Sequence, residues 1–167
     1  DTSLSDERYF ENEDLKGGAV LVPEKGLVED VVILDYKSLY PTIMMAHNLC
    51  YSTVVLADSP EKKDIITSPS GGSFVSPNVS PWVMPQVLKE LLDQRTETKR
   101  LMKKASEEER RFLDAKQYAL KILLNSFYGY SGYARARLYS LALANAVTSF
   151  GRENIIRTKK IIDDIGS

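Results

Sequence analysis

The chain has 167 residues, 43% of them hydrophobic, and a formal net charge of -1 at pH 7. This is the length of one domain with a modest core, and no apolar run is long enough to span a bilayer. The single cysteine, Cys50, excludes an internal disulfide framework, and the near-zero net charge argues mildly against a stand-alone nucleic-acid-binding protein.

Strands are predicted in the first part of the chain. Residues 1–16 are polar and loop-like, and the apolar residues 19–22 predict a short strand that leads into a turn over residues 23–26. Residues 31–34 form a continuous apolar run, which is typical of a strand buried on both faces. A carboxylate, Asp35, stands directly at its end.

A short helix and an irregular excursion are predicted next. Tyr40-Pro41 breaks the strand pattern, and residues 42–48 are expected to open a short helix. Residues 58–81 are rich in Ser, Pro, Gly and Asp, so they predict an irregular segment or a hairpin.

The second half of the sequence has helical periodicity in three stretches. The first begins at Pro85 with an apolar stripe in its first half only, so its second half is expected to project from the body. The second begins after Ser106, an N-cap residue followed by glutamates, and is expected to run to about Phe127 and end at Gly129. The tight turn between them predicts an antiparallel pair. The third stretch spans residues 137–165, and the whole pattern is that of an α+β protein.

The two paired helices carry residues suited to an anion. On the second helix, at about 100° per residue, small and apolar residues cluster on one side and a polar set clusters on another. On the first helix, Arg95 and Lys99 stand on one face. Antiparallel packing would bring three cations and an amide together, which suits a triphosphate, although a solvated helix surface explains the pattern equally well. The polar set is Asp114, Tyr118, Lys121, Asn125 and Tyr128.

Asp35 is the second candidate. A carboxylate at the end of a buried strand is desolvated unless its charge is compensated, and a divalent metal is the usual partner. The alternative, from spacing alone, is an aspartate that caps the following turn. Asp163 and Asp164 fall within a helical period and are interpreted as a solvated helix end.

Two motifs contain these candidates. Residues 35–43 are Asp-Tyr-Lys-Ser-Leu-Tyr-Pro-Thr-Ile, and residues 121–129 are Lys-Ile-Leu-Leu-Asn-Ser-Phe-Tyr-Gly. The first resembles the Asp-x-x-Ser-Leu-Tyr-Pro-Ser palm motif of family B (alpha-like) DNA polymerases, and the second resembles their Lys-x-x-x-Asn-Ser-x-Tyr-Gly fingers motif. Thr42 replaces the commoner serine and keeps a hydroxyl. The resemblance covers essentially the whole chain, and residues 128–137 look most like archaeal members.

The resemblance implies a partial right-hand polymerase fold. Residues 1–84 would form a linker and the first part of the palm, residues 85–129 the fingers as a long antiparallel helical hairpin, and residues 130–167 the return into the palm. The family's third motif, Asp-Thr-Asp, is expected after Ser167, and the thumb and exonuclease lie outside this sequence. The chain begins at Asp1 without a methionine, which suggests a processed or excised piece.

Roles for individual residues also follow from the resemblance. Asp35 would ligate both of two Mg²⁺ ions, the backbone carbonyl of Tyr36 would complete the shell of the nucleotide-bound ion, and Tyr40 would exclude a 2′-hydroxyl beneath the incoming sugar. The predicted nucleotide-binding residues are Tyr36, Ser38, Leu39, Tyr40, Arg95, Lys99, Lys121, Asn125 and Tyr128. The predicted DNA-binding residues are Gly17, Gly18, Gly129, Arg135 and Arg137.

The implied activity is template-directed DNA synthesis, in which the primer 3′-hydroxyl attacks the α-phosphorus of a dNTP with the help of two metal ions. The expected partners are primer–template DNA, the dNTP, the remaining polymerase segments and a sliding clamp, with no membrane. The isolated chain is expected to be inactive. An archaeal source predicts a cytoplasmic location, and a eukaryote or its virus predicts the nucleus.

Two other functions are weighed against this one. A non-catalytic nucleotide- or DNA-binding subunit of a split or inactive polymerase would have no reason to retain Asp35, Tyr40, Lys121 and Asn125 together. A helical interaction protein would explain the periodicity of the helices but not Asp35.

Overall fold

The computed structural model describes residues 16–23, 25–56, 64–79 and 82–166. In this part of the chain, four α-helices accompany a small antiparallel sheet, which confirms a mixed α and β protein. The predictions for residues 1–15, and for parts of the turn over 23–26 and of the excursion over 58–81, lie outside the described residues. Among those described, no helix is both long and apolar enough to cross a membrane.

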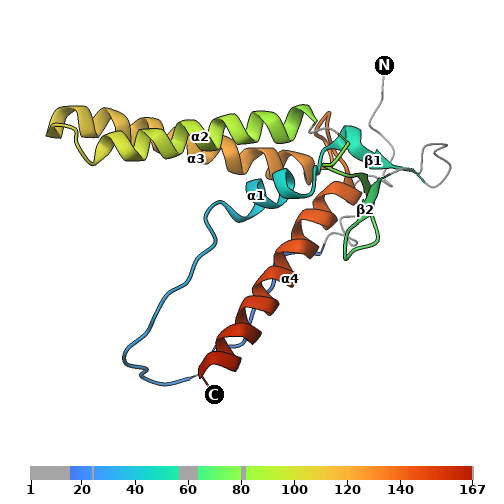
Figure 1. Ribbon diagram of the computed structural model, residues 1–167, viewed down its shortest axis with the longest axis horizontal. Coiled ribbons are helices and arrows are strands. Elements are labelled where there is room, and N and C mark those ends of the chain that lie inside the picture. The colour runs from blue at the N-terminus through green and yellow to red at the C-terminus, as the bar shows by residue number, and fades with distance from the viewer. Residues whose placement is uncertain (1–15, 24, 57–63, 80–81, 167) are drawn as a thin grey trace.

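A long helical hairpin dominates the shape of the molecule (Figure 1). It consists of α2 (Val83–Met102) and α3 (Glu107–Ser131), which run antiparallel as predicted. A capping box begins α3, because the Ser106 hydroxyl accepts the N–H of Glu109 and the Glu109 carboxylate accepts the N–H of Ser106. Glutamates in the first turn add a favourable charge at the positive end of the helix dipole.

The remaining elements gather at the base of this hairpin. The short helix α1 (Leu39–Ala46) lies in the angle between the hairpin and α4 (Leu141–Gly166), as Figure 1 shows. A 3₁₀ turn, Tyr51–Thr53, follows α1 and leads into the sheet. The sheet has the strand order β1-β3-β2, with β1 (Val54–Val55) and β2 (Ile65–Thr67) both antiparallel to β3 (Ser73–Val75).

One hydrophobic core holds these elements together. The largest fully buried side chains come from α1, the sheet, both arms of the hairpin and the first half of α4. The side of α3 that packs into the core is neither the predicted apolar side nor the predicted polar side. Leu120 and Leu124 are buried, whereas Ile122 and Leu123, from the predicted apolar side, are about half exposed. The core contains Leu120 and Leu124 together with Met44, Leu49, Phe74, Leu88, Leu143 and Val147.

The ends of several helices differ from those predicted. Helix α1 begins at Leu39 rather than at residue 42, because a proline such as Pro41 is tolerated in the first turn of a helix. Helix α3 continues through Gly129 to Ser131, and Gly132 is its C-cap, with an N–H that donates to the Tyr128 carbonyl.

Helix α4 begins at Leu141, four residues later than predicted. The Tyr130 hydroxyl accepts the backbone N–H of Arg137, so this residue belongs to a turn. The Ser140 hydroxyl accepts the N–H of Leu143, which is the geometry of an N-cap. The predicted end at residue 165 lies one residue before the end of α4 at Gly166.

The two strands predicted before Asp35 do not form. Residues 19–22 and 31–34 are extended but pair with no strand in the described part of the chain. The prediction that residues 31–34 form a strand buried on both faces is therefore wrong, since Ile33 is 87% exposed and Leu34 is 65% exposed. A strand needs neighbours for its backbone N–H and C=O groups, and the described elements provide none beside these segments.

Candidate functional site

A cleft of about 670 Å³ lies at the base of the hairpin, between α2, α3 and the segment that leads into α1. It brings together Asp35 and all nine residues that the sequence predicts to bind a nucleotide. One further cation, Lys37, joins them. The lining residues are Asp35, Tyr36, Lys37, Ser38, Leu39, Tyr40, Arg95, Lys99, Lys121, Asn125 and Tyr128.

The cationic wall of the cleft comes from both arms of the hairpin. Arg95 and Lys99 are one turn apart on α2, and Lys121 and Asn125 are one turn apart on α3, so that each pair faces one side of its helix. Within the described residues, Lys99 and Lys121 form no ion pair. Their charges are therefore available to an anion in the cleft.

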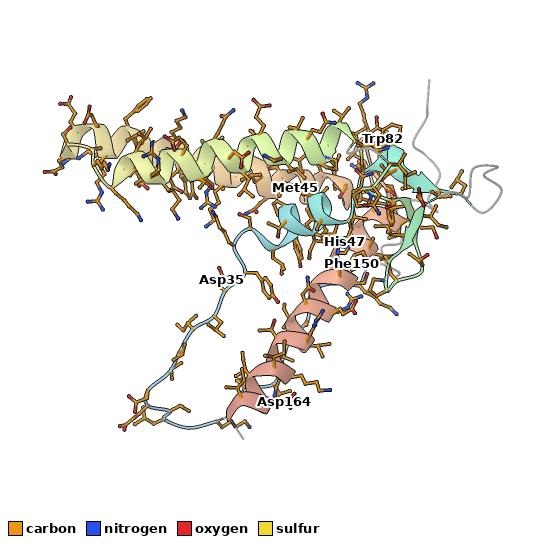
Figure 2. All side chains as sticks on the ribbon, viewed as in Figure 1. Asp35, Met45, His47, Trp82, Phe150 and Asp164 are labelled. Carbon is orange, nitrogen blue, oxygen red and sulfur yellow. The ribbon has the colours of Figure 1, made fainter. Side chains whose placement is uncertain are left out.

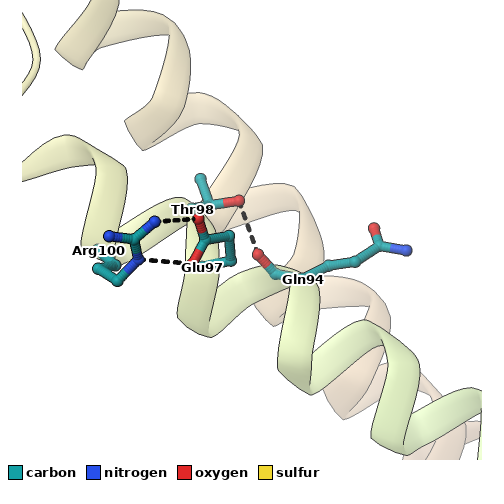
Figure 3. A network of polar contacts seen from close by, with 4 residues as sticks. All are labelled: Gln94, Glu97, Thr98 and Arg100. Atoms are coloured by element: carbon teal, nitrogen blue, oxygen red, sulfur yellow. Dashed lines mark hydrogen bonds and ion pairs between the residues drawn. The ribbon is translucent and has the colours of Figure 1, made fainter.

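Other charges of the hairpin are already paired. Figure 3 shows Arg100, next to Lys99, donating two hydrogen bonds of 2.6 and 2.7 Å to the carboxylate of Glu97. This bond from Arg100 lowers the pKa of the Glu97 carboxyl. On α3, Arg111 pairs with Glu107 through a single contact of 3.0 Å. The interpretation of a solvated helix face thus fits Arg100 and Arg111. For Lys99 and Lys121, which are also exposed, the role in binding an anion stays a prediction.

The segment that carries Asp35 is fixed on two sides. The Lys37 ammonium donates to the Thr96 hydroxyl on α2 at 3.2 Å, and the Tyr36 hydroxyl contacts the Thr158 hydroxyl and the Asn154 carbonyl on α4. Figure 2 shows Asp35 where the long extended connection returns toward the hairpin. Its carboxylate is exposed at the mouth of the cleft, not desolvated as predicted for the end of a buried strand.

Two tyrosines form the floor of the cleft. The ring centroids of Tyr40 and Tyr128 are 4.4 Å apart. Burial, and then the neighbouring Tyr40, raises the pKa of the Tyr128 hydroxyl, while Arg152 lowers it. A Cβ atom placed on Gly151 would come within 3.3 Å of the Tyr40 ring, and one on Gly18 within 3.3 Å of its hydroxyl. The position of the Tyr40 ring therefore depends on two glycines from distant parts of the chain.

Gly18 is held in this position through its neighbours. The Arg152 guanidinium donates to the carbonyl oxygens of Lys16 and Gly17. The Thr148 hydroxyl donates to the Lys16 carbonyl, and the Lys16 N–H donates to the Asn145 side chain. These contacts attach the first described residues to α4 along one face of the helix.

Several predicted residues lie outside the cleft. Gly129 is exposed on α3, and Arg135 and Arg137 are exposed in the turns between α3 and α4. The exposed residues Asp163 and Asp164 lie near the far end of α4, and Figure 2 shows Asp164 well away from Asp35. Asp163 forms an ion pair with Lys159.

The sequence did not predict two residues that do not line the cleft but contact side chains that do. Gln117 accepts a hydrogen bond from Arg95, and Gly151 makes room for Tyr40. Gln117 lies one helical turn before Lys121, and this spacing was the only available signal for it. Gly151 gave no signal, because nothing in its helix indicates that an aromatic ring from α1 rests on it.

Comparison with known proteins assigns the chain to a family. The profile described as DNA polymerase family B matches residues 3–167. The chain belongs to DNA polymerase family B. This confirms the family that the motifs at Asp35 and Lys121 predict.

Relatives of this family B chain are much longer than it is. It is 41% identical over 156 residues to the DNA polymerase delta catalytic subunit of Oryza sativa subsp. japonica, a match that covers 89% of this chain and 14% of the relative. The corresponding subunit of Schizosaccharomyces pombe is 39% identical over 160 residues, covering 91% of this chain and 15% of the relative. The chain thus spans about a seventh of the length of these curated relatives.

A solved archaeal structure resembles the fold. The family B DNA polymerase from Pyrobaculum calidifontis superimposes with a TM-score of 0.75 and 35% sequence identity, covering 91% of this chain and 20% of the archaeal one. Because the relatives named above are eukaryotic and this structure is archaeal, the archaeal likeness of residues 128–137 stays a prediction.

Proposed function

We propose that this chain binds the incoming nucleotide for a DNA-directed DNA polymerase, with residues 85–129 as the fingers and the flanking segments as part of the palm. The observation that carries the proposal is the cleft, in which Arg95, Lys99, Lys121 and Asn125 face the same space as Asp35 and Tyr40. The named relatives are catalytic subunits, which favours catalysis over a purely binding role.

The cations and the amide suit the triphosphate of a dNTP. The planar guanidinium of Arg95 can donate two parallel hydrogen bonds to one phosphate, while Lys99 and Lys121 act as point charges. The Asn125 amide adds a neutral donor. Because these donors come from both arms of one hairpin, they would hold a triphosphate between the two helices, in the same cleft as Tyr40.

The metal expected for this chemistry fits the cleft only together with its substrate. The described residues contain no group of three His, Cys, Asp or Glu side chains placed to hold a metal, so this part of the chain offers no complete cage. Mg²⁺ usually takes one or two carboxylates and completes its shell with phosphate oxygens and water. Asp35 would supply the carboxylate, and the Tyr36 carbonyl would supply one further oxygen ligand. When bound, two such ions would stabilise the charge on the attacking and leaving oxygens.

The two tyrosines would position the sugar and the base. Tyr40 lines the cleft with Tyr128 against it, so the ring of Tyr40 would exclude a 2′-hydroxyl from a sugar placed over it. The reaction needs no nucleophilic side chain from this chain. Its residues would orient the α-phosphorus for in-line attack by the primer 3′-hydroxyl and keep the released pyrophosphate neutralised.

The partners follow from this role. Primer–template DNA and a dNTP would be the substrates, and segments that supply the further carboxylates would complete the active site. A nuclear location is proposed for a eukaryotic source.

Calorimetric titration with a dNTP, with and without Mg²⁺, tests the proposal. We expect Mg²⁺ to strengthen nucleotide binding to the wild-type chain and Asp35→Ala to abolish that gain. Asp163→Ala is the matched control, since this exposed carboxylate already pairs with Lys159 and lies outside the cleft. Equal affinity with and without Mg²⁺, or the same loss in both variants, would contradict the assignment of Asp35.

A further inference from the structure

Arg95 is held from the back of the cleft by the opposite helix. Its Nη2 atom donates to the Oε1 atom of Gln117 on α3 at 3.4 Å. The Gln117 Nε2 atom in turn donates to Asp114 at 2.9 Å. The Arg95 Nε atom is buried and has no hydrogen-bond partner among the described residues. The guanidinium is therefore attached at a single point.

The contact with Gln117 and the burial of Nε together restrict how the planar guanidinium can turn. The donors of an arginine lie in one plane, so fixing Nη2 between the helices leaves the opposite edge of the guanidinium turned to the cleft that Arg95 lines. The contact with Asp114 also decides which way the Gln117 amide points. With its NH₂ group occupied by the carboxylate, the amide presents its oxygen to Arg95.

The neutral charge of Gln117 matters as much as its position. On the same helix as Arg95, the carboxylate of Glu97 binds Arg100 through two short hydrogen bonds and takes up its charge. A carboxylate at residue 117 would compete in the same way with any anion in the cleft. An amide oxygen holds the guanidinium in place and leaves its positive charge for a ligand.

We propose that Gln117 is a positioning residue that presents Arg95 to a triphosphate, with Asp114 fixing the orientation of the Gln117 amide. This inference rests on the proposed function, because it takes a polyphosphate as the ligand of the cleft. It adds to the cleft a residue that does not line it and that acts only through Arg95.

Binding of inorganic tripolyphosphate to the full chain, measured by calorimetry, tests the role of Gln117. We expect Gln117→Leu to weaken binding roughly three- to tenfold, the effect of losing one hydrogen bond. Gln117→Glu should weaken binding as well, because its carboxylate competes with the ligand for the charge of Arg95. The same pairing keeps Arg95 in place, so the thermal stability should stay that of the wild type. A residue with a merely structural role would not separate affinity from stability in this way. Gln94→Leu, which removes an exposed amide on α2, should leave affinity unchanged.

A double-mutant cycle with Arg95→Ala decides whether Gln117 acts through Arg95. We expect Gln117→Leu to have no further effect once Arg95 is removed. An equal loss in both backgrounds, or wild-type affinity in Gln117→Glu, would overturn the inference.

Nuclear magnetic resonance of the Arg95 Nε–H group separates this inference from the proposed function. In the absence of any ligand, Gln117→Leu should increase the mobility of this group, and unchanged mobility would overturn the contact itself. A wild-type chain that fails to bind tripolyphosphate, but whose Arg95 becomes mobile in Gln117→Leu, would contradict the proposed function and leave Gln117 as the anchor of Arg95.

Discussion

Lys121 and Lys103 carry the same charge at opposite ends of the hairpin. Lys121 lines the cleft, whereas Lys103 is the C-cap of α2 and lies outside it. Lys121→Ala is expected to weaken dNTP binding by about 1.5–3 kcal/mol, the usual contribution of a charge-assisted hydrogen bond. Lys103→Ala should change it far less. Calorimetry of both variants makes the comparison, and similar losses would indicate a diffuse electrostatic surface in place of a defined phosphate site.

His47 is a second residue whose surroundings make a measurable prediction. Its ring stacks on Phe150 with centroids 3.8 Å apart and an interplanar angle of 4°, and the two lie together in Figure 2. Burial lowers the pKa of the His47 imidazole, and the nearby Glu153 opposes this effect by raising it. The folded chain therefore binds a proton less readily at this site than the unfolded chain does.

The sign of the pH dependence follows from that difference. The contribution of His47 to stability is fully present above the unfolded pKa of about 6.5 and is lost as the pH falls toward the lower folded value. We expect the free energy of unfolding to decrease as the pH is lowered from about 7.5 to about 5. His47→Phe keeps the stacking and should remove this part of the slope, as urea unfolding at several pH values would show. An unchanged slope would mean that other groups cause it.

At the scale of elements, two helical glycines provide a matched pair. A Cβ on Gly151 in α4 would press on the Tyr40 ring at 3.3 Å, and Tyr128 limits the movement of that ring. A Cβ on Gly129 in α3 would meet nothing within 4 Å. Within a helix, alanine stabilises the fold by about 1 kcal/mol relative to glycine. Overpacking a core destabilises it by about 1–3 kcal/mol.

Opposite effects are therefore expected from the same substitution. Gly129→Ala should raise the free energy of unfolding by up to about 1 kcal/mol, because only the helix propensity changes. Gly151→Ala should lower it by about 1 kcal/mol, because the clash exceeds that gain. Chemical denaturation measures both. A stabilising Gly151→Ala would mean that α1 moves freely away from α4.

Local signals predicted the helices well and their ends less well. The hairpin followed from the cap at Ser106 and from the helical period on both sides of it, both of which depend on neighbours in sequence. Gly129 did not end α3, because the helix continues to Ser131, whose hydroxyl donates to the Tyr128 carbonyl, and is capped by Gly132. The strands at residues 19–22 and 31–34 failed because pairing depends on a partner that composition does not reveal.

The cleft was predictable to the extent that its residues belong to motifs. Spacing placed Lys121 and Asn125 on one face of α3, and antiparallel packing brought Arg95 and Lys99 opposite them. Gln117 and Gly151 were not predicted, because each acts through a side chain on another helix. Such contacts depend on tertiary packing and are not indicated by any periodic pattern in the sequence.

At the scale of the whole molecule, the proposed function makes the cleft one half of a two-metal site. Among the described residues, Asp35 is the only carboxylate that lines it, and catalysis by two metals needs further carboxylates on the other side of the ion pair. We expect the purified chain to show no primer extension. Activity should return when a segment that carries the family's Asp-Thr-Asp motif and thumb is added, since its strand can pair beside residues 31–34.

A primer-extension assay, first with the chain and then with the complementing segment, checks this expectation. Extension by the chain alone would contradict it. If that activity survived in Asp163→Asn combined with Asp164→Asn but not in Asp35→Asn, a second carboxylate other than these would have to exist within the chain.

The exposed run at residues 31–34 also has a consequence for handling the protein. Val31, Val32, Ile33 and Leu34 are 65–87% exposed, unpaired and rich in β-branched side chains, the features of a segment that nucleates cross-β aggregates. Charged gatekeepers bracket the run, with Glu29 and Asp30 before it and Asp35 after it. Asp35 is therefore expected to help keep the chain dispersed, in addition to its proposed role in the cleft. Neutralising Asp35 removes one gatekeeper, so a loss of function in such a variant has to be separated from a loss of monodisperse protein.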